Sequence, residues 1–205
     1  PSALVLATHG SWNAAIQIGL PSAETDSWKE LLGWGHSQAG LVLPASAATS
    51  KAADLILHAS RLARGLTLLT DGTAYDVITH EYLNPSDWKD RPLNHFRTSD
   101  HIVVDHAESG DSSLERLYTR GLTKFGLDEL ETLRPVGLPS RPILDSLADI
   151  AREILLVGHS PRVGSTLEMP GLGIAVQVMK HRTTVPSEGS VPVREIVWDE
   201  LAGKD

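Results

Sequence analysis

Two short stretches of the sequence place a histidine or a serine where chemistry is possible. In ALVLATHG (residues 3–10) His9 directly follows an apolar run, and in GHSQAG (residues 35–40) Ser37 stands in a pattern close to the Gly-x-Ser-x-Gly elbow. A histidine so placed accepts phosphate or helps to form an oxyanion hole, and an elbow serine is a nucleophile. Ala39 replaces the last glycine of the elbow, and the residues after it predict a strand rather than the required helix. His9 and Ser37 are therefore weak catalytic candidates.

A cluster of histidines and acids at DHIVVDHAESGD (residues 100–111) raises the question of a metal site. On a strand that rises ~3.3 Å per residue, His101 and Asp105 would share a face but lie ~13 Å apart. Only His106 and Glu108 are spaced so that both could bind one ion directly, and two ligands are too few for a tight site. His101, His106 and Glu108 are therefore weak metal candidates, and we expect no cofactor.

Composition excludes several classes of partner. The formal net charge is -8 and the sequence pI is about 5.5, so the chain repels phosphate backbones and nucleic-acid binding is not expected. No apolar run approaches the ~18 residues that span a membrane. Cysteine is absent, which removes disulfides and thiolate sites. The first residues lack the basic region and apolar core of a signal peptide, so we expect a cytoplasmic protein.

The hydrophobic pattern predicts one α+β domain over residues 1–205. Apolar residues spaced by three and four predict two main helices, at 46–64 and 142–156, which end before Gly65 and Gly158. Residues 26–34 favour a shorter helix, and residues 84–100 a long loop. The expected sheet is mixed or antiparallel, with the two main helices packed on it. Its predicted strands lie at 3–8, 14–18, 39–43, 66–70, 101–107, 173–179 and 191–198.

Residues 114–133 are ambiguous, because RLYTRGLTKFG suits a strand with a glycine bulge and DELETL suits a strand or a helix. The segment is similar to one found in a bacterial domain family of uncharacterised function, of the type Thr-x-Gly-Leu-x-x-Phe-Gly-x-x-Glu-x-Glu. The matching residues are Thr119, Gly121, Leu122, Phe125, Gly126, Glu129 and Glu131. The resemblance extends more weakly over residues 39–180. It implies an α+β fold and a strand over 117–125, and it supplies no catalytic residues.

These observations favour a non-catalytic domain that binds a protein partner or a small ligand, with a homodimer possible. The expected binding surface is a half-exposed polar strand face that carries Arg120, Lys124, Glu129 and Glu131. The alternative is a hydrolase that uses Ser37 or a site of histidines and carboxylates near His101.

Overall fold

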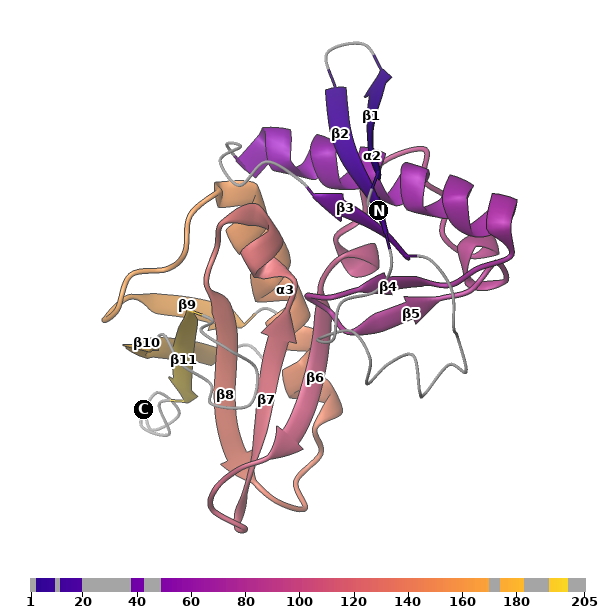
Figure 1. Ribbon diagram of the computed structural model, residues 1–205. Helices are drawn as coiled ribbons and strands as arrows, with labels where there is room; N and C mark the ends of the chain where they lie inside the picture. Colours follow the sequence, from indigo (N-terminus) through magenta and orange to yellow (C-terminus); the bar gives the residue numbers. More distant parts are fainter. Residues whose placement is uncertain are drawn as a thin grey trace.

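The computed structural model describes residues 3–9, 12–19, 38–42, 49–169, 174–182 and 192–198. These residues form two long helices, three short 3-10 helices and eleven strands (Figure 1). The helices are α2 (Thr49–Thr70), α3 (Arg141–Val157), η2 (Asp87–Lys89), η3 (Thr98–Asp100) and η4 (Leu122–Phe125). None of the helices in these segments is long and apolar enough to cross a membrane.

The strands form three sheets, and the largest, of six strands, follows the order β6-β7-β8-β11-β10-β9. Within it only β8 and β11 pair in parallel, so the predicted α+β class with a mixed sheet is confirmed. Its strands are β6 (Val103–Glu108), β7 (Leu114–Arg120), β8 (Glu129–Pro135), β9 (Thr166–Met169), β10 (Ile174–Arg182) and β11 (Val193–Trp198). The second sheet has three strands, β1 (Ala3–His9), β2 (Trp12–Gly19) and β3 (Gln38–Val42). The third is a hairpin of β4 (Ala74–Asp76) and β5 (Glu81–Leu83).

Helix α3 covers one face of the six-stranded sheet, and β6, β7 and β8 lie in front of it in Figure 1. Side chains on a strand alternate between the two faces. Leu117 on β7 points to the helix side, where it is fully buried against a core that includes Leu147 and Ile150 of α3. Arg116 and Tyr118, its neighbours along β7, therefore point to the opposite face, which we call the open face.

Helix α3 begins and ends close to the predicted limits of 142–156. Gly158 ends it with a left-handed backbone (φ 81°), and its N–H donates to the carbonyl oxygen of Ile154. A side chain is disfavoured at such an angle, so the glycine after the periodic apolar run is a reliable stop signal here.

Helix α2 departs from prediction at its C-terminal end. It continues through Gly65 to Thr70, so the strand predicted at 66–70 is wrong. The hydroxyl groups of Thr67 and Thr70 donate to carbonyl oxygens one turn earlier in the helix, which satisfies these polar side chains without leaving the helical conformation. The helix ends instead at Thr70, and Asp71, which follows it, has a positive φ of 52°.

The segment predicted as a long loop, 84–100, contains η2 and η3 and carries a small core of its own. Trp88 and Leu93 are buried against Leu57 of α2 and Leu83 of β5. The β4–β5 hairpin and β9 were not predicted, and the helix predicted at 26–34 lies outside the described residues.

Candidate functional site

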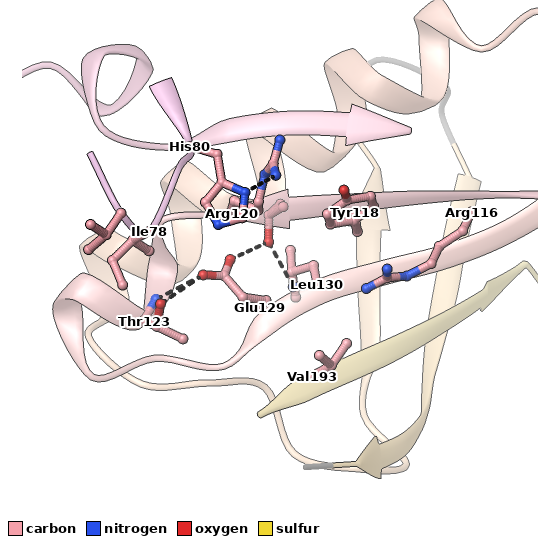
Figure 2. A pocket seen from close by; sticks show the side chains of 11 residues that line it. Ile78, His80, Arg116, Tyr118, Arg120, Thr123, Glu129, Leu130 and Val193 are labelled. Atoms are coloured by element: carbon pink, nitrogen blue, oxygen red, sulfur yellow. Dashed lines mark hydrogen bonds between the residues drawn. The ribbon is translucent and has the colours of Figure 1, made fainter. Parts of the chain in front are cut away.

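A pocket of about 90 Å³ lies on the open face of the sheet, between the β4–β5 hairpin and strands β7, β8 and β11 (Figure 2). Its size suits a few water molecules or one small side chain rather than a drug-sized ligand, for which pockets usually measure ~300–1,000 Å³. The lining residues are Val77, Ile78, His80, Arg116, Tyr118, Thr119, Arg120, Thr123, Glu129, Leu130 and Val193.

Glu129 forms the polar floor of the pocket, and its carboxylate is saturated with hydrogen bonds. Oε1 accepts from the backbone N–H groups of Gly121 and Thr123 and from the Thr123 hydroxyl, and Oε2 accepts from the hydroxyl of Thr119 at 2.7 Å. Burial raises the pKa of Glu129, and these donors partly offset that effect. The carboxylate thus orders the turn after β7 and has little capacity left for a ligand.

Two arginines flank Tyr118 on β7. The guanidinium carbon of Arg116 lies 4.1 Å from the centre of the tyrosine ring, and that of Arg120 lies 5.6 Å from it. Arg116 Nε donates to the fully buried Glu131 at 2.5 Å, and Arg120 forms an ion pair with Asp105 of β6. These contacts hold both arginines along the wall of the pocket.

The β4–β5 hairpin is tied to the rest of the fold by ionic contacts. Lys124 forms an ion pair with Asp76 and also donates to the backbone oxygen of His101 at 3.0 Å. Burial acts to raise the pKa of Asp76, but the charge and hydrogen bond of Lys124 outweigh it and hold that pKa below its ordinary value. At the end of the turn, His80 adopts a positive φ of 60°, and its Nδ1 lies 3.1 Å from a guanidinium nitrogen of Arg120.

The four residues predicted to form the binding surface lie close together but do not form one exposed strand face. Arg120 and Glu129 line the pocket, Glu131 is fully buried beneath Arg116, and Lys124 fastens the hairpin. The strand predicted over 117–125 ends at Arg120, and the residues from Leu122 form η4. The strand stops because Gly121 turns the chain with a φ of 121°.

The metal candidates are not brought together. His101 is buried and stacks on Phe96 (ring centres 4.9 Å apart), whereas His106 and Glu108 are exposed on β6. In the described part of the chain, no three histidine, aspartate or glutamate side chains are grouped so that they could hold a metal ion. His101 also precedes β6 rather than belonging to it, so the predicted start of that strand was wrong.

The two catalytic candidates, Ser37 and His9, stay predictions. Ser37 lies outside the described residues, and His9 is placed only as the last residue of β1, where it pairs with Trp12.

Comparison of the chain with protein-family models, with curated proteins and with solved structures gave no match.

Sequence reasoning did not identify the hairpin residues or the roles of Arg116 and Tyr118. A usable signal was present, because Arg116, Tyr118 and Arg120 recur every second residue and so share one face of a strand. No comparable signal linked His80 to Arg120, which is 40 positions away.

Exposed apolar side chains lie beside the pocket and further along the open face. Val77, at the tip of the hairpin, is 67% exposed, and Ile78 beside it is 39% exposed. Leu133 of β8 pairs with Arg116 across the strands, and Val197 lies on the same face of β11 as Val193; they are 38% and 39% exposed. Val77 and Ile78 thus form an apolar edge of the pocket, and Leu133 and Val197 lie ~13 Å further along the open face, at ~3.3 Å per strand residue.

Burial of His101 makes the stability of the protein depend on pH. Burial, followed by the nearby charge of Lys124, lowers the pKa of His101 from 6.5 to about 4. The folded state therefore resists protonation, so this contribution is complete above about pH 6.5 and is lost as the pH falls to about 4, up to about 3 kcal/mol.

We expect His101→Phe to remove this dependence, because phenylalanine preserves the stacking on Phe96 without a titrating group. Urea unfolding at several pH values between 7 and 4 would measure it. The exposed His106 provides the control, since His106→Asn should retain the wild-type slope. Parallel curves for the wild type and His101→Phe would contradict the prediction.

Proposed function

We propose that this chain is a protein-binding domain whose partner docks on the open face of the six-stranded sheet, with the pocket at the centre of the contact. Tyrosine and arginine are the residue types that contribute most to protein interfaces, above all around small central pockets. Here Tyr118 lies between Arg116 and Arg120 in the wall of such a pocket.

The observation that carries the proposal is the exposed apolar edge that Val77 and Ile78 give the pocket. Val77 and Ile78 lie at the tip of the β4–β5 hairpin. The contacts of Lys124 with Asp76 and of Arg120 with His80 hold this hairpin in place, so the two apolar side chains face solvent from an ordered position. Apolar side chains grouped around a pocket with a polar surround are typical of interaction surfaces. The size of the pocket agrees, because about 90 Å³ suits one partner side chain.

Catalysis by the same pocket has less support. The closest hydroxyl–carboxylate pair is Thr119 and Glu129, but Thr119 is 1% exposed and its hydroxyl also accepts the N–H of Leu130. A nucleophile needs a free path to a substrate, which this hydroxyl lacks. The hydrolase alternative, with Ser37 or a site of histidines and carboxylates near His101, stays a prediction, as do the bacterial family resemblance and the cytoplasmic location.

Site-specific photocrosslinking in the native host tests the proposal. A benzophenone amino acid would replace Val77 in one variant and Leu133 in a second, with Leu69 of α2 as a control position that is 85% exposed and does not line the pocket. We expect the first two variants to give the same crosslinked partner and the control to give none. An adduct of twice the chain mass would identify the partner as a second copy.

With the captured partner purified, charge substitutions measure the interface. Val77→Glu should weaken binding about tenfold or more, because it places a charge at an apolar contact without disturbing the core. Leu69→Glu should bind like the wild type in the same calorimetric titration. Equal affinity for all three proteins would refute the docking surface.

A further inference from the structure

We infer that strand β6 receives an extended, acidic segment of a partner protein, which adds to the sheet as a further strand and places an apolar side chain between β6 and α3. This site lies at the edge of the sheet and on the side of α3, so it is separate from the pocket on the open face and does not depend on the proposed function. It follows from the backbone edge of β6, the groove beside it and the charges along that groove.

Strand β6 is the first strand of the six-stranded sheet and, within the described part of the chain, pairs only with β7 (Figure 1). Its six residue pairs with β7 follow one another without a bulge, and the strand contains no proline. A regular edge strand of this length presents a row of backbone groups to which another strand can add.

The hydrogen bonds of β7 identify which backbone groups of β6 face outwards. The N–H of Val136 donates to the carbonyl oxygen of Ser113 at 2.9 Å, so every second residue from Ser113 onwards along β7 directs its backbone groups to β8. The residues between them direct theirs to β6. By the register of the two strands, the backbone groups of Val104, His106 and Glu108 therefore point away from the sheet.

One of these outward groups is already used. The N–H of His106 donates to the carboxylate of Asp105 at 2.8 Å. An added strand would therefore bond to both backbone groups of Val104 and to the carbonyl oxygens of His106 and Glu108.

A groove of about 300 Å³ lies between β6 and α3, on the side of the sheet opposite the open face. Val104 of β6 and Leu144 of α3 line it and pack against the main core, and Ile102 and Ala148 add further apolar surface. This volume is at the lower end of the ~300–1,000 Å³ of ligand pockets, so it has room for a leucine side chain. Because side chains alternate along a strand, every second residue of a strand added to β6 would face this groove.

The charges of the groove favour an acidic segment. Its lining carries two arginines, Arg141 and Arg152, against one carboxylate, Asp145, although the chain as a whole has a net charge of -8. Arg141 donates to Asp145 through Nε, and Arg152 pairs with Asp149 through one terminal nitrogen. The two arginine side chains are 85% and 56% exposed, and a guanidinium has five N–H donors. Each arginine therefore keeps donors for a carboxylate of the segment.

The two arginines also set the spacing of the expected segment. Arg141 and Arg152 are eleven positions apart on α3, which is ~16 Å along the helix at ~1.5 Å per residue. Five residues of an extended strand span ~13 Å from first to last, and the long side chains of glutamate and arginine cover the difference. Acidic, apolar and acidic residues at alternate positions would thus meet arginine, groove and arginine in order.

A second copy of the chain fits the edge less well. Only residues with outward backbone groups can bond to each other across a new antiparallel pair, so two copies of β6 with the greatest overlap would centre on Asp105 or on His106. The first register places two carboxylates opposite each other, which is destabilising. The second places the apolar Val104 opposite the charged Glu108.

A synthetic peptide tests the site directly. The probe is Thr-Glu-Thr-Leu-Thr-Glu-Thr with blocked ends, titrated into the ¹⁵N-labelled full chain while the backbone amide signals are followed by NMR. We expect saturable shifts of Val104, His106 and Glu108, with a dissociation constant of about 0.1–1 mM. The peptide with lysine in place of both glutamates should bind at least about fivefold more weakly, and equal affinities would overturn the requirement for an acidic segment.

Methylation of the peptide backbone tests strand addition. One derivative carries N-methyl groups on the leucine and both glutamates, and a second carries them on the two threonines that flank the leucine. Because only alternate amides of an added strand face β6, one derivative should lose binding and the other should keep most of it. Equal losses would overturn the strand geometry.

Variants of α3 test the groove. Ala148→Leu fills it and Arg152→Glu reverses its charge, and neither position is buried, so the fold should be retained. Each should weaken binding of the acidic peptide about fivefold or more, whereas Arg162→Glu, which makes the same change of charge at an exposed position outside the groove, should bind like the wild type. Unchanged affinity in both groove variants, or no shift with any peptide, would overturn the inference.

Two further variants separate this site from other contacts. Val77→Glu should bind the peptide like the wild type, because Val77 lies at the pocket on the open face. In His106→Pro, proline blocks the outer edge of β6 without removing a hydrogen bond to β7, so the peptide should no longer bind. A free chain that sediments as a dimer, and as a monomer in His106→Pro, would assign the edge to a second copy and overturn the inference.

Discussion

Gly121→Ala is expected to destabilise the protein by about 3–5 kcal/mol, one of the largest effects of a single methyl group in this fold. A Cβ at this position would lie 2.2 Å from the backbone oxygen of His101 and 3.1 Å from the Cα of Ile102. The backbone φ of 121° is also one that side chains rarely adopt. Because the obstructing atoms belong to the main chain, the clash can be relieved only by moving the segment before β6 or the turn after β7.

Gly126→Ala is the matched control, since it lies at the other end of η4. Its φ of 71° is also positive, but a Cβ there would meet nothing within 4 Å. Only the left-handed conformation is penalised, so the expected loss is about 1–2 kcal/mol. Urea unfolding of both variants at neutral pH measures the difference. Equal losses would show that the close approach of Gly121 to His101 does not limit stability.

This turn explains the pattern of residues on which the family resemblance rests. Thr119 donates to Glu129, Gly121 makes the close approach, and Gly126 supplies the left-handed end of η4. Leu122 and Phe125 are buried in the main core between them. The residue types in this stretch are thus those that a strand, a tight 3-10 turn and a returning strand require, whatever the protein binds.

The sequence was informative where structure depends on near neighbours. The periodic apolar residues of α3 and its terminal Gly158 gave the helix within a residue or so at each end, and the alternation in β10 and β11 gave two strands. These features need only the local repeat of a helix or strand and a residue that ends it.

The site was less predictable because contacts between distant segments create it. His80 and Lys124 join the hairpin to β7 and η4 across 40 and 48 positions. The burial of Glu129 and Glu131 was also not predicted. Two acids that alternate with Leu130 indicate the solvent-facing side of a strand, and the pattern does not show that a neighbouring strand supplies hydrogen-bond donors to them. Thr119 and Arg116 on β7 are those donors.

Glu131→Leu is expected to destabilise the protein by about 3–5 kcal/mol, because it leaves Arg116 charged, largely buried and without its carboxylate. Glu131 is fully buried, and Arg116 has only 13% of its side chain exposed. Leucine preserves most of the volume, so the loss reports on the charge rather than on a cavity. The exposed pair of Arg141 and Asp145 is the control, and Asp145→Ala should change the free energy of unfolding by less than about 0.5 kcal/mol.

The double variant with Arg116→Met and Glu131→Leu separates two explanations. Either the ion pair stabilises the fold more than apolar side chains would, or the fold is destabilised only when one charge is left without the other. A buried ion pair often contributes little over apolar side chains of similar size, because desolvation of two charges offsets their attraction. We therefore expect the double variant to recover most of the stability lost by Glu131→Leu alone, as measured by urea unfolding. Because Arg116 also stacks on Tyr118 in the pocket wall, the same variant should still bind its partner more weakly than the wild type. A double variant that is both stable and fully active in binding would show that Arg116 serves neither the fold nor the interface.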